Sequence, residues 1–208
     1  RGTTLEKDGV KLKTTEHVLA ALVGLEIDNI LIEINAEEPP IMDGSSRFFV
    51  DALEKAGLKE LSRLRNEYIV KDVISLNDPE SGSEITIIPS ENYQITTMVD
   101  YETKVLGTQN ATLTKLSEFK DEFSNARTFS FLHEIEMLLE NNLIKGGDLN
   151  NAIVYVDKKI SENTMEKLKK AFNKDKVSVK SNGILDNLNL HYQNEAARHK
   201  LLDVLGDL

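Results

Sequence analysis

Four short β-rich runs between residues 68 and 113 constrain the fold of this chain more than any other feature of its sequence. Turns such as Asp78-Pro79-Glu80-Ser81-Gly82 separate the runs, whose bounds are Tyr68–Leu76, Glu84–Ile88, Tyr93–Tyr101 and Gln109–Leu113. Strands that follow one another through short turns pair most readily as antiparallel neighbours. We therefore expect a sheet of antiparallel strands in the middle of the chain.

The first third of the chain predicts a helix, a strand, a turn and a second helix. Apolar residues recur at helical spacing from Thr14 on, with a threonine as the N-cap. The alternation of apolar and polar residues over Asn29–Asn35 indicates a half-buried strand. The turn residues Asp43-Gly44-Ser45-Ser46 lead into a helix over residues 47–56, which Gly57 would end.

Beyond the β-rich runs, the sequence predicts three helices and two strands. The helices span residues 128–144, 163–172 and 195–208, and the strands span residues 151–156 and 177–180. Strand-plus-helix units in succession are typical of α+β proteins. We therefore expect an α+β fold of two layered β-sheet-plus-helix halves, with the active site between them.

The polar stretch Lys59–Asn66 marks a boundary between the two halves. We expect a first α+β domain over residues 1–65 and a second α+β domain over residues 66–208. The chain begins without a methionine and ends directly on a helical pattern. Since natural termini more often end in polar tails, we expect this chain to be a piece of a longer protein.

Charge and composition exclude several classes of protein. The chain carries 25 basic and 35 acidic residues, and its net charge of −10 argues against a broad contact with the backbone of nucleic acid. Cysteine is absent, which excludes disulfide scaffolds, cysteine-ligated zinc and thiol nucleophiles. The apolar runs are too short to cross a bilayer. We expect a cytoplasmic protein without an integral membrane segment.

His199 and Asp203 are four residues apart on a predicted helix, which places both side chains on one face. An imidazole and a carboxylate in this arrangement can take adjacent positions around a metal ion. The same spacing is also common in ordinary surface pairs on helices. The spacing alone therefore leaves both interpretations open.

Glu16 and His17 begin the first predicted helix. Successive helical residues point about 100° apart, so these two side chains cannot bind one ion from a single face. They can divide the work, with His17 as a metal ligand and Glu16 as a proton acceptor beside it. Alternatively, Glu16 complements the positive end of the helix, and His17 caps the helix or packs.

Together, His17, His199 and Asp203 would supply two imidazoles and one carboxylate to a metal ion. That set suits an open zinc site, and it equally suits the facial triad of a non-haem iron enzyme. We expect the other two histidines, His133 and His191, to be surface residues rather than ligands. The sequence contains no glycine-rich nucleotide loop and no G-x-S-x-G elbow.

Four segments of the chain resemble signatures of the LpxC family of UDP-3-O-acyl-N-acetylglucosamine deacetylases, in the family's order. The first segment, Thr14-Thr15-Glu16-His17-Val18-Leu19-Ala20-Ala21-Leu22, resembles the family's T-x-E-H-L-x-A-A-L. The other three segments are Ile34-Asn35 through Pro40-Ile41-Met42-Asp43-Gly44-Ser45, Ala126-Arg127-Thr128-Phe129-Ser130-Phe131 and Arg198-His199-Lys200-Leu201-Leu202-Asp203-Val204-Leu205-Gly206-Asp207-Leu208. They cover nearly the whole chain. The resemblance implies a zinc-dependent hydrolysis of the N-acetyl group of UDP-3-O-acyl-N-acetylglucosamine, a committed step of lipid A synthesis that releases acetate.

The resemblance also implies roles for the residues that match the family's motifs. His17, His199 and Asp203 match the three ligands of the Zn²⁺ cofactor. Glu16 matches the general base, and Asp207 matches the carboxylate that orients a catalytic histidine.

Further matches concern the substrate. Thr128 matches the residue whose hydroxyl helps to stabilise the oxyanion. Phe129 and Lys200 match contacts near the sugar and the diphosphate, where Lys200 and its neighbour Arg198 would offer positive charge. The segment around residues 131–157 corresponds to the insert that forms the acyl-chain passage. Its apolar residues, among them Leu132, suit the wall of such a passage and equally suit an ordinary helix core.

Two departures from the family limit what this chain is expected to do. The family's first strands, before the Glu-His segment, are missing, and so is the Gly-His segment that supplies the general acid. The chain alone could therefore bind zinc and yet turn over slowly or not at all. The region Ser81-Gly82-Ser83-Glu84-Ile85 resembles a form of the family fused to a β-hydroxyacyl-ACP dehydratase, so we expect such a domain beyond residue 208. A non-haem iron enzyme and a non-catalytic fragment that binds a nucleotide sugar or a partner remain the alternatives.

Overall fold

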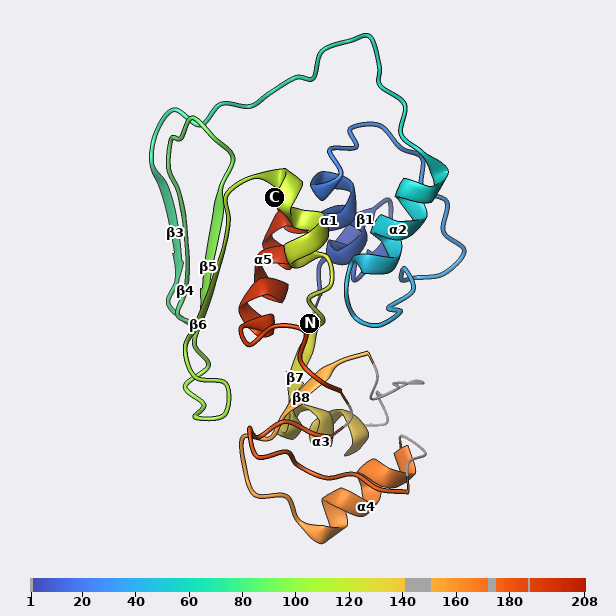
Figure 1. Ribbon diagram of the computed structural model, residues 1–208, viewed down its shortest axis with the longest axis vertical. Helices are drawn as coiled ribbons and strands as arrows, with labels where there is room; N and C mark the ends of the chain where they lie inside the picture. Colours follow the sequence, from blue (N-terminus) through green and yellow to red (C-terminus); the bar gives the residue numbers. More distant parts are fainter. Residues whose placement is uncertain (1, 141–150, 172–174, 187) are drawn as a thin grey trace.

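Two helices from opposite ends of the chain lie side by side at the centre of the molecule. The computed structural model describes residues 2–140, 151–171, 175–186 and 188–208. Helix α1 (Glu16–Gly24) and helix α5 (Glu195–Asp207) make the most extensive contact between two elements of these ranges (Figure 1). A Cβ atom on Gly206 would lie 2.1 Å from the carbonyl oxygen of Glu16, so only glycine allows so close an approach of the two backbones.

A short hairpin precedes α1 and was missed by the sequence analysis. Strands β1 (Thr4–Lys7) and β2 (Val10–Lys13) pair antiparallel. Asp8 and Gly9 between them both adopt positive φ, the conformation that a two-residue type I′ turn requires. The Asp-Gly pair was therefore a usable signal for this hairpin. Its residues are mostly exposed, so the hydrophobic pattern carried little information.

The strand predicted over Asn29–Asn35 is wrong, because the structure has no strand there. Ile30, Ile32 and Ile34 are exposed. A strand forms only where a neighbour completes its hydrogen bonds, and no strand of the described residues pairs with this segment. The following helix is confirmed: α2 spans Arg47–Ala56, with Gly57 at its C-terminal end.

The four predicted β-rich runs all contain strands, but they form two separate sheets rather than one. Their bounds are β3 (Ile74–Asp78), β4 (Ser83–Ile87), β5 (Ile95–Val99) and β6 (Gln109–Leu113). β3 pairs antiparallel with β4, and β5 pairs antiparallel with β6. Of these two pairs, β5–β6 is the one that packs against α5. The β3–β4 pair lies beyond β5–β6, farther from α5 (Figure 1). A 3₁₀ turn and a short π-helical segment over residues 116–123 connect β6 to the next strand.

The helix predicted over residues 128–144 begins later than expected. Strand β7 (Phe129–Phe131) comes first, and α3 (Leu132–Glu140) follows it. The reason is tertiary, because β7 finds a parallel partner in β8 (Ile153–Tyr155), which fulfils the predicted strand over 151–156. The predicted end of that helix after residue 140, and part of the predicted acyl-passage insert over 131–157, lie outside the described residues.

The remaining predictions for this half are partly confirmed. Helix α4 spans Glu162–Ala171, close to the predicted 163–172, whose last residue is outside the described ranges. The strand predicted over 177–180 is reduced to a single bridge between Val179 and Leu185. The last helix is confirmed as α5. Helices and small sheets together make the fold α+β, as predicted.

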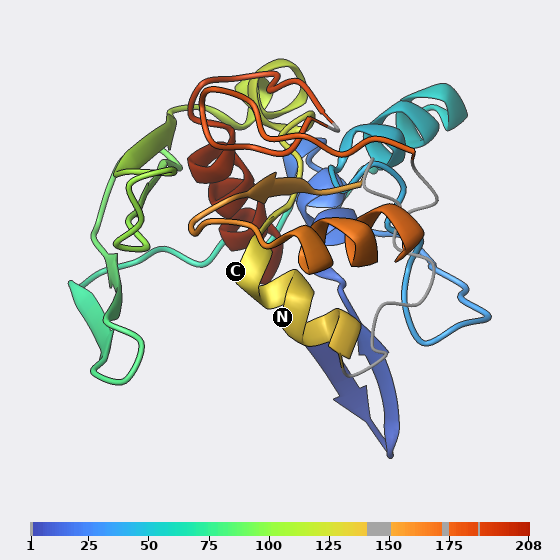
Figure 2. The same cartoon turned by 90° about the horizontal axis from the view of Figure 1, so that it is seen from below.

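Two apolar clusters form the core. The larger one joins α1, α2, α5, the inner face of β5–β6 and the β7–β8 pair, and it includes the buried ring of Phe119. The smaller one lies between α3, α4 and β8, which remain close together in both views (Figures 1 and 2), and it comprises Leu132, Ile135, Val154, Leu168 and Leu185. None of the described helices combines the length and the apolar character needed to cross a membrane.

Candidate metal centre

The contact between α1 and α5 brings together three side chains that can bind a metal ion. His17 lies on α1, and His199 and Asp203 lie one turn apart on α5, with one donor atom of each within 4.8 Å of the others. Asp203 Oδ1 is 3.3 Å from Nε2 of His199 and 3.7 Å from Nε2 of His17. The predicted set is thus assembled in space, although its members are far apart in sequence. Their role as ligands stays a prediction.

Asp203 supplies the observation that tests whether a metal ion fits here. Its Oδ2 atom accepts a hydrogen bond from Lys200 Nζ at 2.8 Å. Its Oδ1 atom is buried and has no hydrogen-bond partner within the described part of the chain. A buried carboxylate oxygen without a partner is costly, and two imidazole nitrogens face this one. A cation between the three groups would satisfy all of them, so the residues fit a metal ion.

A ring contact orients His199, and a backbone contact holds the segment of α1 that carries His17. Nδ1 of His199 lies 3.0 Å from the carbonyl oxygen of Ala126. Since a carbonyl can only accept, Nδ1 carries the proton and Nε2 is free to donate its lone pair to a metal. On α1, the Ser46 hydroxyl donates to the carbonyl oxygen of His17 at 2.7 Å.

Burial and charge set the protonation of these groups. Burial lowers the pKa of His17 to about 4, and the neighbouring His199 acts in the same direction. Neutral imidazole is the form that binds metal ions, so His17 is held ready for that role at neutral pH. Burial acts to raise the pKa of Asp203, but His199 and Lys200 outweigh it, and the net shift is downward. The carboxylate is therefore ionised.

Glu16 is buried beside this group at the start of α1. Its Oε2 atom accepts a hydrogen bond from the backbone N–H of Thr3 at 3.0 Å. Burial raises the pKa of the Glu16 carboxyl, against the lowering effect of backbone N–H groups, and the nearby Asp203 and Asp207 raise it further. A raised pKa is what a carboxylate needs to accept a proton near neutral pH.

The turn over Asp43–Ser46 joins the two sides of the site, which the sequence analysis did not foresee. Gly44 accepts a backbone hydrogen bond from Thr128 at 2.8 Å, and its φ of +83° favours glycine. A Cβ atom on Gly44 would lie 2.0 Å from the backbone oxygen of Asn151. The sequence predicts Asp-Gly-Ser-Ser as a turn before a helix and as part of a family-like segment, and the structure adds that it contacts the backbone of Thr128 and, through Ser46, that of His17.

Phe129, the first residue of β7, and Lys200 on α5 lie next to each other beside the group of three. The ring of Phe129 is 6.5 Å from that of His199, and Lys200 Nζ lies 5.8 Å from the centre of the Phe129 ring. Arg198, the second cation expected near a diphosphate, points elsewhere because residues two apart on a helix lie on opposite faces. It lies 3.1 Å from Glu122 and stacks on Tyr192. Of these two cations, Lys200 is therefore the one that presents its charge beside the group of three.

Four other predicted residues are placed by the structure as follows. Leu132 is fully buried in the smaller cluster, and its contact with an acyl chain stays a prediction. Asp207 accepts a hydrogen bond from the Thr3 hydroxyl at 2.6 Å. His133 is partly exposed and pairs with Asp157, and His191 lies at the surface against Asn125, so neither belongs to the group of three.

Comparisons with known proteins agree with the resemblance noted in the sequence. The family model of UDP-3-O-acyl N-acetylglycosamine deacetylase matches residues 1–177. The chain is 44% identical over 208 residues to the bifunctional enzyme LpxC/FabZ of Bacteroides thetaiotaomicron. The matched region is 100% of this chain and 45% of that protein. It is 46% identical over 216 residues to the protein of that name from Chlorobaculum tepidum, again 45% of its length.

A relative that is named only as a deacetylase is also similar to this chain. The UDP-3-O-acyl-N-acetylglucosamine deacetylase of Saccharophagus degradans is 36% identical over 209 residues, which are 99% of this chain and 60% of that protein. The chain thus spans about half the length of the bifunctional relatives and somewhat more of this one.

Proposed function

The chain belongs to the LpxC family of UDP-3-O-acyl N-acetylglycosamine deacetylases, and from that premise we propose that it carries the metal site of such a deacetylase. The reaction would be hydrolysis of the N-acetyl group of UDP-3-O-acyl-N-acetylglucosamine, with release of acetate, in lipid A synthesis. The single observation that carries the proposal is the buried, unpartnered Oδ1 of Asp203 facing two imidazole nitrogens.

His17, His199 and Asp203 would hold the metal ion, and we propose that it is zinc. Two imidazoles and one carboxylate are a common set for catalytic zinc. When bound, zinc supplies Lewis acidity and a water of lowered pKa, which an unactivated amide needs at neutral pH. The neutral state of His17 and the ionised state of Asp203 support binding without prior loss of protons.

Glu16 would accept the proton of the attacking water. Its carboxyl is held by the Thr3 backbone N–H, and its raised pKa suits a group that takes up a proton and retains it. Thr128 would donate its hydroxyl to the oxyanion, an interaction typically worth about 10²–10³-fold in rate for one donor. Its backbone is fixed by Gly44 on one side and by Ile153 of β8 on the other.

Lys200 and Phe129 would contact the substrate beside the metal. The ammonium group of Lys200 is shared between Asp203 and the face of the Phe129 ring, and Asp203 raises the pKa of Lys200 against the effect of burial. A permanently charged lysine at this position suits an anionic substrate group. Asp207 would orient a catalytic histidine.

We further propose that the whole protein is bifunctional. Three relatives that match this chain end to end carry the name LpxC/FabZ, and the sequence resembles the form fused to a β-hydroxyacyl-ACP dehydratase. In that case a dehydratase domain accompanies the deacetylase in the same polypeptide.

Metal content and turnover of matched variants test the proposal. The whole protein, purified without added metal, is expected to hold about one zinc per chain and to release acetate from UDP-3-O-acyl-N-acetylglucosamine. His199→Ala should lose the metal and the activity. Glu16→Gln should retain the metal and lose at least about 10²-fold in kcat. His133→Ala is the control, since His133 lies outside the group of three.

The outcomes separate the alternatives. Iron in place of zinc, with oxygen-dependent turnover, would support the facial-triad alternative. Absence of any metal from the unaltered protein, with retained affinity for a nucleotide sugar, would support a non-catalytic binding fragment. Normal turnover by Glu16→Gln would remove Glu16 from the mechanism.

A further inference from the structure

Arg127 and Glu195 form a buried ion pair close to His199, and the proposed mechanism gives this pair no role. Arg127 is 5% exposed and Glu195 is 0% exposed. Glu195 Oε1 accepts from the backbone N–H of Arg127 at 3.1 Å and from Nε at 2.9 Å, and Oε2 accepts from Nη2 at 3.3 Å. The backbone N–H of His191 also donates to Oε2, at 2.6 Å.

Such a pair is hard to explain as a source of stability. Two charges lose their hydration on burial, and apolar residues of similar volume are often as stable or more stable in their place. What a fully hydrogen-bonded pair does provide is geometry, because the fork of an arginine matches a carboxylate in one orientation only. The question is therefore which atoms this geometry places.

Arg127 belongs to a largely buried segment, residues 124–128, whose backbone contacts the ring of His199 and the turn that precedes α2. We name this segment the strap. The Ser124 carbonyl accepts the backbone N–H of Ser46, whose hydroxyl holds the carbonyl of His17. The Ala126 carbonyl accepts Nδ1–H of His199.

The other end of the strap is Thr128, which donates its backbone N–H to Gly44. Arg127 stands between the carbonyl that orients His199 and the residue expected to meet the oxyanion. Its partner Glu195 begins α5, one turn before His199. The ion pair thus joins the strap to the helix that carries two of the three metal-binding side chains.

We propose that Arg127 and Glu195 are positioning residues, which fix the strap on α5 so that the Ala126 carbonyl holds His199 with Nε2 toward the metal. The proposal rests on the proposed function, in that it takes His17, His199 and Asp203 as the metal-binding group. It adds a device that acts on the metal through His199 without touching it, and outer contacts of this kind typically change metal affinity by about 10–100-fold.

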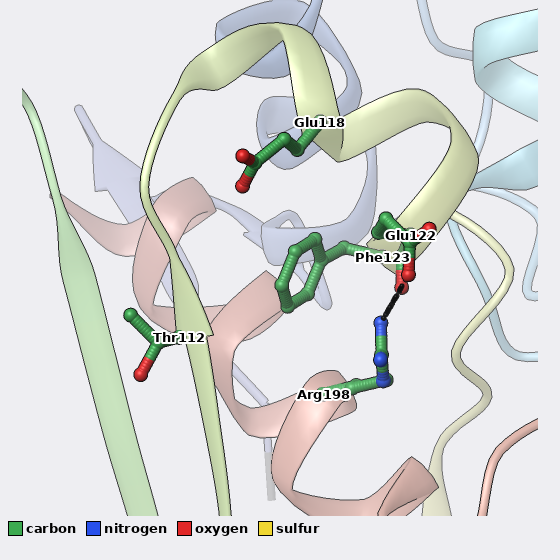
Figure 3. A pocket seen from close by; sticks show the side chains of 5 residues that line it. All are labelled: Thr112, Glu118, Glu122, Phe123 and Arg198. Atoms are coloured by element: carbon green, nitrogen blue, oxygen red, sulfur yellow. Dashed lines mark hydrogen bonds and ion pairs between the residues drawn. The ribbon is translucent and has the colours of Figure 1, made fainter.

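The same helix offers a matched control. Arg198 is adjacent to His199 in sequence, but its guanidinium lies against Glu122 and Phe123 (Figure 3). Glu122→Gln removes a charge partner from an arginine of the same helix without touching the strap. A general effect of altering an ion pair on α5 would appear in this control, and a positioning effect would not.

The test measures the affinity of the whole protein for Co²⁺ by competition with a chelator, together with the visible absorption spectrum of the bound ion. The double variant Arg127→Met with Glu195→Leu removes both charges and leaves no charge unpaired. The variant also leaves the backbone N–H groups of Arg127 and His191 without the acceptor that Glu195 supplies, so we expect its urea midpoint without metal to be lower than that of the unaltered protein. Its affinity for Co²⁺ should fall about 10–100-fold, with an altered spectrum. Glu122→Gln should change the affinity less than about twofold.

Arg127→Lys provides a second route if the double variant does not fold. Lysine keeps the charge but cannot reproduce the two-pronged contact, so the affinity should again fall, while the fold persists. Unaltered affinity and an unaltered spectrum in a folded Arg127→Lys or double variant would overturn the proposal. Failure of the unaltered protein to bind Co²⁺ would refute the proposed function, and this inference with it, and would be visible before any variant is made.

Discussion

The strand pairs β3–β4 and β5–β6 have the same length and the same antiparallel pairing, yet they have opposite surroundings. In β5–β6, the alternate residues Ile95, Val99, Ala111 and Leu113 are buried against α5. In β3–β4, the residues of the apolar face include Ile74, Leu76 and Ile85, which are 51%, 69% and 49% exposed.

The difference shows that an alternating pattern predicts a strand but does not supply the partner that buries it. Both pairs carry a polar face with a hydroxyl contact, Ser75 to Thr86 in one and Thr96 to Thr112 in the other. What distinguishes β5–β6 is α5, whose apolar side chains cover it and whose opposite side meets α1. The helix that supplies two of the three candidate metal ligands is thus also part of the larger core.

Truncation of one leucine in each pair is the direct test of this comparison and has the largest expected effect. Leu113→Ala would leave a cavity under α5 and should lower the free energy of unfolding by about 2–5 kcal/mol. Leu76→Ala, at an exposed position of β3, should change it by less than about 0.5 kcal/mol. Urea unfolding of both variants measures the difference. Equal losses would mean that β3–β4 is covered in solution.

Acid should destabilise the metal-free protein through His17, which lies in the contact between α1 and α5. The pKa of His17 is about 4 in the folded chain against 6.5 for an unperturbed histidine. Above pH 6.5, both states are neutral and His17 contributes no pH dependence. As the pH falls from 6.5 toward 4, the unfolded chain binds a proton that the folded chain does not. The metal-free protein should therefore lose roughly 3 kcal/mol over this window.

The size of the acid effect also depends on Glu16, and a control variant separates the contribution of His17. Glu16 acts in the opposite sense, because its raised pKa lets the folded chain take up a proton first, so the net loss should be somewhat smaller. Urea unfolding at pH 7 and pH 5, in the presence of a chelator, gives the slope. His17→Phe is the control and should flatten it. A slope that persists in His17→Phe would assign the effect to another group.

A methyl group between α1 and α5 should have a smaller but more specific effect. Gly206→Ala would place a Cβ atom 2.1 Å from the Glu16 carbonyl oxygen and 2.9 Å from the Ala20 nitrogen, neither of which can rotate away. Overpacking of this kind typically costs about 1–3 kcal/mol. Since the helices must separate, His17 should also move from His199 and Asp203, and affinity for Co²⁺ should fall.

Gly82→Ala is the matched substitution in β3–β4. Gly82 lies in the turn between these strands with φ of +69°, and nothing lies within 4 Å of a Cβ placed on it. The change should strain only the turn and leave the affinity for Co²⁺ unaltered. Loss of Co²⁺ binding in Gly82→Ala, or its unaltered retention in Gly206→Ala, would contradict the view that the contact between α1 and α5, and not the β3–β4 pair, links packing to the site.

Much of the local structure could be predicted from the sequence. Helices α1, α2, α4 and α5 lie within a few residues of their predicted bounds, because periodicity, glycine stops and turn residues act over a single element. The errors lie where an element depends on a neighbour. Residues 29–35 have a strand pattern but no partner among the described residues, whereas Phe129–Phe131 has a helical pattern and pairs with β8.

The candidate site divides in the same way. The identities of His17, His199 and Asp203 follow from two motifs in the sequence, and the spacing on one helix already placed His199 beside Asp203. Their assembly with His17 was decided by the packing of α1 on α5, which Gly206 allows. The strap and its ion pair could not be predicted, because Arg127 and Glu195 meet only when residues far apart in the chain are folded together. Sequence by itself determined the elements and the chemical groups, since these depend on local conformation and residue type. Tertiary structure alone decided which groups face one another, since burial and the need to satisfy buried polar atoms act only between packed elements.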